Sequence, residues 1–396
     1  MNRLKSPLAA VICGGIIMGL ALGVRHVQGL FMLPMTAAHD WSREDFALAI
    51  ALQNLVWGVA QPITGMVADR FGSRRVLVGG CLLYGAGLYL MAHAASRLEL
   101  ALTGGVLIGM ALAGTAFGTV YGALSRIVAP QRRGWAMGVA GAVGGVGQFA
   151  MVPAAQGLIG QLGWLAALVV LALVLAMSAP LAAPLDDSAG PHGPALPLRA
   201  VVAAALSHRG FWLLNLGFLA CGFQLAFIAG HLPAYLADKG FSANTGVIAL
   251  AIVALSNVAG NYACGRLGSL YRRKRLLAYL YLVRSLAMLL FLVVPVSTAS
   301  VYVFAAAMGL TWLGTVPLTN GLVAQIFGVQ YISTLFGLVF VGHQLGGFLG
   351  VWLGGAVFDA THSYDLVWVV AVGLGLVAAL LHLPIDDRAL LSMKVA

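Results

Sequence analysis

The chain has 396 residues, of which 61% are hydrophobic and only 9% are charged, and its formal net charge is +10. A water-soluble domain of this length needs a much larger charged surface. The composition therefore excludes an ordinary soluble protein and favours one built within a lipid bilayer. The 51 glycines fit helices that approach one another closely in lipid.

The apolar residues fall in stretches of about twenty or more, the length that a helix needs to cross a hydrocarbon layer roughly 30 Å thick. Backbone inside lipid must satisfy its own hydrogen bonds, so we expect helices there. In chain order the predicted spans are 8–37, 45–68, 74–94, 98–126, 134–160, 163–183, 210–237, 243–268, 275–296, 300–326, 332–358 and 364–384. The predicted fold class is an all-α membrane protein with twelve transmembrane helices.

The basic residues gather on one side of these spans. With the N-terminus inside, seventeen of the 22 Lys and Arg residues fall in cytoplasmic segments and three in outer loops, while Arg25 and Arg284 lie within the membrane. Cytoplasmic loops of membrane proteins carry such an excess, so both termini are predicted to be cytoplasmic. Topology thus explains the net charge, and no nucleic-acid partner is expected. The four cysteines lack metal-ligand spacing, and neither a metal nor another cofactor is expected.

An internal repeat divides the chain. Shifting the sequence by 200 residues brings Gly65 onto Gly265 and Arg74-Arg75 onto Lys274-Arg275. Six spans restore the same orientation, so the two halves are expected to be parallel copies about the membrane normal. Transporters of that design bind their substrate near the midplane between the halves.

The longest connection between spans is rich in Pro, Gly and Asp, as is typical of a flexible polar linker. It sets the predicted domain boundaries. These are an N-terminal six-helix bundle at 1–183, a cytoplasmic linker at 184–207 and a C-terminal six-helix bundle at 208–396.

The loop between the second and third predicted spans reads GMVADRFGSRR. It resembles the G-x-x-x-D-R-x-G-x-R-R signature of the major facilitator superfamily, and every signature position matches. These positions are Gly65, Asp69, Arg70, Gly72, Arg74 and Arg75. The resemblance implies a loop that holds the cytoplasmic face closed while the outside is open. An ordinary positively charged loop would explain the arginines, but not the spaced glycines and Asp69.

Two arginines lie within spans, whereas no Asp or Glu lies deep in any of them. An arginine at a helix centre costs about 2.5–3.5 kcal/mol on insertion scales and usually faces a cavity or a partner. Since no internal carboxylate is available to Arg25, we predict that an anionic substrate supplies the negative charge. The alternative for Arg25 is that it reaches toward the outer interface. Arg284 is interpreted as a structural strut that binds backbone carbonyls or Asn side chains.

The segment 23–31, GVRHVQGLF, resembles the first helix of the monocarboxylate transporter family and its oxalate:formate antiporter relatives. The resemblance covers the first two helices best and implies transport of a small organic anion. The chain departs from that family in the eighth helix. There the family carries an arginine, and this sequence has Asn257 and Asn261.

Polar and aromatic residues deep in the spans are candidates to line the path. The predicted substrate-binding residues are Arg25, Gln28, Trp57, Tyr121, Asn257, Asn261, Trp312, His343 and Gln344. A histidine titrates near pH 6.5, so His343, with His26 as second candidate, can accept a coupling proton. Hydrogen bonding between helices remains open as the role of each polar residue.

The resulting hypothesis is a secondary active transporter of the inner membrane that moves a small carboxylate by alternating access as a monomer. Proton symport is the favoured coupling, and anion exchange stays open. The first alternative is a drug/proton efflux antiporter, which usually needs an acidic residue in the membrane. A membrane sensor or intramembrane enzyme is the second, but neither needs a two-fold repeat. The sequence has no nucleotide-binding loop and no metalloprotease helix, so no enzyme activity is predicted.

Overall fold

The computed structural model describes residues 6–129, 132–187, 198–327 and 332–390, and these residues contain no strand. The first six helical elements are α1 (Pro7–Val27), α2 (Gly29–His39), α3 (Arg43–Phe71), α4 (Ser73–Ala92), α5 (Arg97–Leu100) and the π-helix η2 (Ala101–Leu107). The next six are α6 (Ile108–Thr115), α7 (Phe117–Ile127), α8 (Arg133–Met177), the 3₁₀-helix η4 (Ala179–Leu185), α9 (Leu198–Leu206) and α10 (Arg209–Asp238). The last six are α11 (Ala243–Leu270), α12 (Arg273–Val293), α13 (Thr298–Thr311), α14 (Thr315–Phe327), α15 (Ile332–Thr361) and α16 (Asp365–His382).

Within the described chain, eleven segments are long and apolar enough to cross a membrane. One of them, Trp135–Leu185, has 51 residues, which is enough for two crossings of a hydrocarbon layer about 30 Å thick. Helix α8 changes direction inside this segment at Gly163, whose φ of 80° and ψ of 165° suit glycine because it has no Cβ. The predicted spans 134–160 and 163–183 meet at this residue. The predicted all-α fold with twelve crossings is confirmed.

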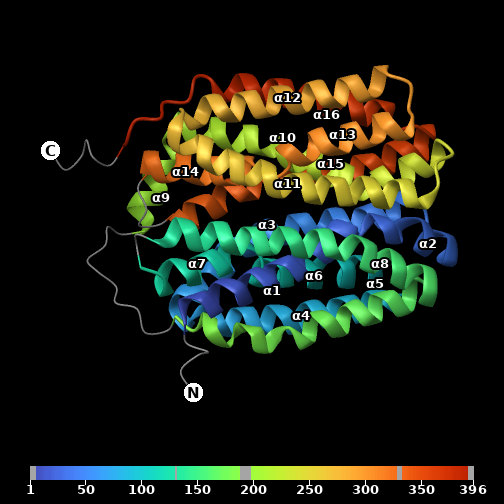
Figure 1. The fold of residues 1–396 in the computed structure, drawn as a ribbon, viewed down its shortest axis with the longest axis horizontal. Helices are drawn as coiled ribbons and strands as arrows, with labels where there is room; N and C mark the ends of the chain where they lie inside the picture. The colour runs from blue at the N-terminus through green and yellow to red at the C-terminus, as the bar shows by residue number, and fades with distance from the viewer. Residues whose placement is uncertain (1–5, 130–131, 188–197, 328–331, 391–396) are drawn as a thin grey trace.

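The helices form two groups that lie side by side along the length of the molecule (Figure 1). Helices α1 to α8 make up one group and α10 to α16 the other. Helix α1 packs along α8 in the first, and α10 packs along α15 in the second. The two groups meet mainly through α3 against α15 and α8 against α11. The central part of the molecule therefore lies between α1, α3 and α8 on one side and α10, α11 and α15 on the other.

The segment between the two groups contains one element that the sequence did not predict. Helix α9 occupies Leu198–Leu206, inside the range 184–207 that was expected to be a flexible linker. Residues 188–197 of that range lie outside the described residues. The exact domain boundaries stay a prediction.

The two ends of the bundle differ in charge. The end at which α1 begins and α16 ends (Figure 1), called the basic end below, holds Arg126 and the run Arg272 to Arg275. At this end Asp187 accepts hydrogen bonds from Arg126 Nε and Ser73 Oγ, both at 2.7 Å. The opposite end, called the far end, holds the start of α3 and the end of α10.

Three of the predicted spans are broken near their middles. The first is split into α1 and α2 at Gln28. The fourth is split at Ala116, where φ is −90° and ψ is −163°. The tenth is split between Thr311 and Thr315. A break frees backbone groups that have no water to bind inside a bilayer, so protein groups must satisfy them.

Buried polar side chains satisfy the break in the tenth span. Arg284 is fully buried and donates to the carbonyl oxygens of Thr311 and, at 3.0 Å, Trp312. Asn257 Oδ1 accepts from the backbone N–H of Leu313 at 3.0 Å. The strut interpretation of Arg284 is confirmed for the carbonyls. Its side-chain partners are Cys221 and Gln224, at 3.3 and 3.4 Å, rather than an asparagine.

The contact of α10 with α15 depends on glycine. A methyl group at Gly222 would overlap the carbonyl oxygen of His343 and would approach the backbone nitrogen of Gly347 to 2.9 Å. Forcing extra atoms into such a contact typically costs about 1–3 kcal/mol. We therefore expect Gly222→Ala to lower the melting temperature of the detergent-purified protein, measured by tryptophan fluorescence. The matched control is Gly373→Ala, because Gly373 has no neighbour within 4 Å of the added carbon. Equal melting temperatures for the two variants would contradict the packing account.

Candidate functional site

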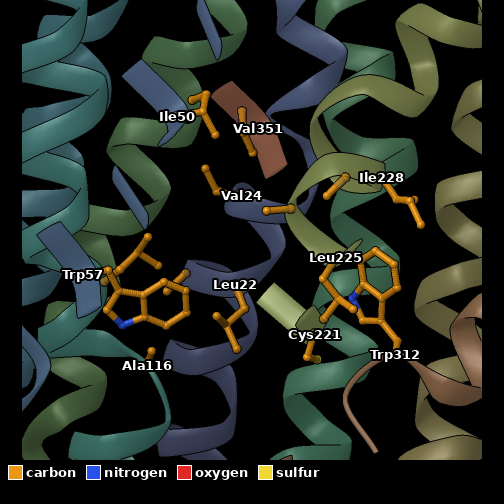
Figure 2. Close-up of a cluster of buried hydrophobic side chains, with 14 of the residues drawn as sticks. Leu22, Val24, Ile50, Trp57, Ala116, Cys221, Leu225, Ile228, Trp312 and Val351 are labelled. Atoms are coloured by element: carbon orange, nitrogen blue, oxygen red, sulfur yellow. The ribbon is translucent and has the colours of Figure 1, made fainter. Parts of the chain in front are cut away.

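A cavity with an empty volume of about 540 Å³, part of it open to solvent, lies between the two groups of helices. Both groups contribute to its lining, which consists of Leu22, Arg25, His26, Trp57, Phe117, Gln148, Leu225, Trp312, Leu313, Val316, Phe340 and His343. Figure 2 shows Trp57 and Trp312 on opposite sides of this space, with Leu22 and Leu225 between them. We call it the larger chamber.

A second cavity shares Arg25 with the first and is called the smaller chamber. Its empty volume of about 240 Å³ includes space that is open to solvent. Its lining residues are Arg25, Gln28, Gly29, Ile50, Asn54, Ala226, Ala229, Gly230 and Val351. Ile50 and Val351 lie together at the upper part of the close-up, away from the two tryptophans (Figure 2). Arg25 lines both chambers, so its guanidinium lies where they meet.

The guanidinium of Arg25 has polar and aromatic neighbours but no acidic one among the described residues. Its Nη2 donates to Asn54 Oδ1, and its Cζ lies 5.2 Å from the centre of the Trp57 ring. Asn54 is held in place because its Nδ2 donates to the carbonyl of Ile50 at 2.8 Å. Nε of Arg25 is buried and has no hydrogen-bond partner in the described part of the chain. A buried donor left unpaired costs about 1–3 kcal/mol, which favours a ligand that accepts from it.

The break in the first span places a second unpaired group beside Arg25. Helix α1 ends at Val27 and α2 begins at Gly29, with Gln28 between them. Residues 25 and 28 are three apart, so they lie on the same side of the helix. Gln28 is 3% exposed, and neither atom of its side-chain amide has a partner in the described chain. Arg25 and Gln28 together present hydrogen-bonding groups to the smaller chamber.

Two histidines line the larger chamber, and they differ in whether Nε2 has a hydrogen-bond partner. His26 Nε2 donates to the carbonyl oxygen of Leu250 in α11 at 3.1 Å, so it links the two groups of helices. His343 Nδ1 lies 2.8 Å from the amide oxygen of Gln344, which accepts its proton. The ring of His343 stacks on Phe340 with 5.3 Å between centres. Its Nε2 is buried without a partner in the described residues, which leaves a lone pair available for a proton.

The structure brings together only part of the predicted site. Five of the nine predicted substrate-binding residues line a chamber, namely Arg25, Gln28, Trp57, Trp312 and His343. Gln344 is fully buried and lines neither chamber, and its side-chain oxygen accepts from His343. Tyr121, Asn257 and Asn261 line neither chamber. The reason is visible for Asn257, because its side chain binds the broken backbone of the tenth span.

Several lining residues escaped the sequence prediction. They are the apolar side chains Leu22, Phe117, Leu225, Leu313, Val316 and Phe340. In a chain that is 61% hydrophobic, an apolar residue carries no signal of its own. Phe340 could have been found because it lies three residues before His343 and therefore on the same helix face.

The signature loop lies at the basic end. Gly72 has a φ of 88°, a conformation that glycine adopts without strain. Arg74 lies 3.6 Å from Asp186, Arg75 is exposed, and Gly65 has no neighbour within 4 Å of its Cβ position. The side chains of Asp69 and Arg70 lie outside the described residues. The role of this loop in holding one face closed stays a prediction.

Ionic and polar contacts join the two groups of helices at the far end. Arg43 binds both carboxylate oxygens of Asp238, at 2.7 and 2.8 Å, and donates to Tyr364 Oη at 3.0 Å. The backbone N–H of Glu44 donates to Asp359 at 2.7 Å. We call Arg43, Glu44, Asp238, Asp359 and Tyr364 the far-end gate. These contacts are all formed in this structure.

A close backbone contact lies between the gate and the chambers. A Cβ atom at Gly29 would meet the carbonyl oxygens of Ala229 and, at 2.8 Å, Gly230 in α10. Only a glycine lets α2 and α10 approach this closely. Gly29, Ala229 and Gly230 also line the smaller chamber, so this contact forms part of its wall.

The fold and the central chambers define a class: a helical membrane transporter with a cavity between two groups of helices. A sequence profile of the Major Facilitator Superfamily matches residues 11–351 and 248–391. The chain belongs to this superfamily, as the signature loop predicted. It is therefore a membrane-embedded transporter that carries a small molecule, and its relatives are transporters rather than enzymes.

Within the superfamily, the chain is similar to several individual transporters. Monocarboxylate transporter 13 of Rattus norvegicus is 30% identical over 380 residues, which cover 92% of this chain and 86% of that protein. Monocarboxylate transporter 11 of Homo sapiens is 28% identical and covers 93% and 80%. YcxA of Bacillus subtilis, an uncharacterized MFS-type transporter, is 26% identical and covers 90% of each chain.

A solved structure shares the fold. It is a bacterial homologue of the human lysosomal transporter Spinster, and it matches with a TM-score of 0.75 over 98% of this chain and 99% of that one. The sequence identity is 14%, so this similarity concerns the fold alone.

Proposed function

We propose that the protein carries a small organic monocarboxylate across the membrane by alternating access, with Arg25 binding the carboxylate. The observation that carries this proposal is the guanidinium of Arg25, which lines both chambers without an acidic partner among the described residues. The names of the monocarboxylate transporters that the chain resembles support the same substrate class.

The polar groups of Arg25 and Gln28 that lack a hydrogen-bond partner in the described chain suggest how a carboxylate binds. A carboxylate can accept from the unpaired Nε of Arg25 and from the amide of Gln28, and hydrogen bonds between ionised groups are short and strong. Binding neutralises a charge that the surrounding helices leave uncompensated. Asn54 and Trp57 hold the guanidinium in position, so little side-chain freedom is lost when the anion arrives.

The alternating-access cycle uses the far-end gate. Opening toward the far side requires Arg43 to release Asp238 and His26 to release the carbonyl of Leu250. Both contacts join the two groups of helices, so they form and break together as the groups rock. We assign closure of the opposite, basic end to the signature loop from Gly65 to Arg75.

We assign the basic end to the cytoplasmic side. Its excess of arginine and lysine follows the charge rule for cytoplasmic loops, so both termini are cytoplasmic and the gate faces outward. We assign the protein to the inner membrane, where it works as a monomer without a cofactor.

Proton symport is assigned to His343. Its Nε2 is buried without a partner among the described residues, and protonation there would add a second positive charge beside the anion site. His26 is the weaker candidate because its Nε2 already donates to the carbonyl oxygen of Leu250.

We expect His343→Gln to abolish the stimulation of carboxylate uptake by an inward proton gradient while carboxylate exchange continues. The readout is radiolabelled uptake into proteoliposomes at two pH gradients. The control is His93→Gln at an exposed site, and full gradient stimulation in His343→Gln would rule His343 out.

The experiment that tests the proposed function is uptake of labelled carboxylates by the purified protein in proteoliposomes. The proposal predicts saturable uptake of at least one monocarboxylate, competed by other monocarboxylates and not by neutral amides. A drug/proton antiporter would instead exchange cationic compounds for protons. Among the described residues that line the chambers there is no Asp or Glu, so no counter-charge for a cation is present. Cation transport without carboxylate transport would overturn the proposal.

A further inference from the structure

The two chambers differ in chemistry, and Arg25 belongs to both. The smaller chamber has the polar groups of Arg25, Gln28 and Asn54 among small apolar residues. The larger chamber has four aromatic residues, Trp57, Phe117, Trp312 and Phe340, besides its two histidines and Gln148. One end of the site therefore suits a carboxylate and the other an apolar body.

The aromatic side chains already contact one another in geometries that favour a further ring. Trp57 meets Phe340 edge to face, with ring centres 5.1 Å apart and planes at 68°. The ring of Trp312 meets His26 edge to face at 6.0 Å, and Phe340 stacks with His343. Offset-stacked and edge-to-face pairs are the preferred arrangements of aromatic rings. A ring bound in this chamber would find aromatic surfaces on the Trp57–Phe340 pair, while Leu22 and Leu225, which lie between Trp57 and Trp312 (Figure 2), add apolar surface.

The rest of the lining points the same way. Besides its aromatic rings, the larger chamber is lined by Leu22, Leu225, Leu313 and Val316. A substrate whose apolar body covers these side chains gains the hydrophobic term for the area that it removes from water.

Charge limits the substrate to one carboxylate. Among the described lining residues, Arg25 is the one side chain with a permanent charge. The second carboxylate of a dicarboxylate would enter the aromatic chamber without a fixed positive partner. Burying an unpaired charge is strongly unfavourable.

We propose that the substrate is a monocarboxylate that carries an aromatic ring. Its carboxylate binds Arg25 and Gln28, and its ring occupies the chamber lined by Trp57, Phe117, Trp312 and Phe340. This inference rests on the proposed function, because it identifies the substrate class of the same site.

The test compares four acids as competitors for uptake of labelled phenylacetate into proteoliposomes: phenylacetate, indole-3-acetate, lactate and phthalate. Labelled lactate uptake is measured in parallel. We expect the two aryl monocarboxylates to bind roughly 10- to 100-fold more tightly than lactate, and phthalate not to compete. Phe340→Leu and Phe117→Leu should reduce the preference for phenylacetate over lactate by roughly tenfold. The melting temperature of each purified variant shows whether the carrier is folded. The control Phe241→Leu changes a half-buried phenylalanine between α10 and α11 and should leave the preference unchanged.

Each other outcome has a definite meaning. Saturable lactate uptake that aryl acids do not inhibit would overturn the aromatic substrate and leave the carboxylate carrier intact. Absence of uptake for all monocarboxylates would overturn both. An unchanged aryl preference in Phe340→Leu and Phe117→Leu would remove the aromatic chamber from substrate recognition.

Discussion

Replacing Arg25 with glutamine is expected to lower monocarboxylate uptake by roughly 10- to 100-fold at substrate concentrations below KM. Glutamine keeps a polar side chain that can still contact Asn54, but it removes the charge that pairs with the carboxylate. Arg25→Lys keeps the charge and loses the forked geometry of the guanidinium. Its uptake should therefore fall between those of the native protein and Arg25→Gln. The measurement is the initial rate of radiolabelled uptake, normalised to the amount of folded protein in each liposome preparation.

The matched control for Arg25 is Arg388→Gln. The Arg388 side chain is 86% exposed near the C-terminal end of the described chain, so its loss should leave the uptake rate unchanged. Equal KM values for Arg25→Gln and the native protein would exclude Arg25 from the binding site. The position of Arg25 between the chambers would then need a structural explanation, as for Arg284.

Replacing Asp238 with asparagine is expected to shift the conformational equilibrium toward a far end that is open. The substitution removes the charge of a pair in which Arg43 binds both carboxylate oxygens and lies 3.9 Å from the centre of the Phe358 ring. The two side chains are 15% and 33% exposed, so solvent weakens the pair, and we expect a contribution of about 1 kcal/mol. The open population should then rise roughly fivefold.

Distances between spin labels can measure this shift. Labels at Ala38 in α2 and Ala243 in α11 lie at exposed positions of the far end in different groups of helices. In Asp238→Asn the longer distances should gain population. The exchange of charges in Arg43→Asp with Asp238→Arg should restore part of the native distribution. Glu99→Gln, an exposed far-end change within one group, is the control. An unchanged distribution in Asp238→Asn would show that the pair does not hold the far end closed.

The fold was predictable because membrane insertion leaves a strong pattern in the sequence. The span of about twenty apolar residues is set by the thickness of the hydrocarbon layer, and the charge asymmetry follows from insertion. The division of the segment from Trp135 to Leu185 into two crossings was also predicted, and α8 changes direction at Gly163 as that division requires. The position of Arg25 in a cavity between the two groups follows from the cost of exposing a charge to lipid.

Side-chain roles were less predictable, because a polar residue within a span has two uses. Arg25 faces the chambers, whereas Arg284 satisfies the broken backbone of the tenth span. Asn257, predicted to bind substrate, also binds that break. The breaks themselves depend on tertiary packing, so the sequence does not reveal which polar side chains bind the backbone groups that the breaks leave free.

The gate and the aromatic chamber were not predictable from the chain for a related reason. Arg43 and Asp238 are ordinary charges at helix ends in the sequence, and only the folded structure brings them together. Phe117 and Phe340 are two phenylalanines among 17. Their part in the chamber depends on the rotation of α7 and α15 about their axes.

The central claim is that Arg25 receives the negative charge of the substrate. Its most direct test is calorimetric binding to the purified protein of lactate and phenylacetate, each compared with its neutral amide, lactamide and phenylacetamide. We predict that at least one carboxylate binds, that its amide does not bind measurably, and that Arg25→Gln abolishes the difference. Equal binding of a carboxylate and its amide by the native protein would contradict the claim.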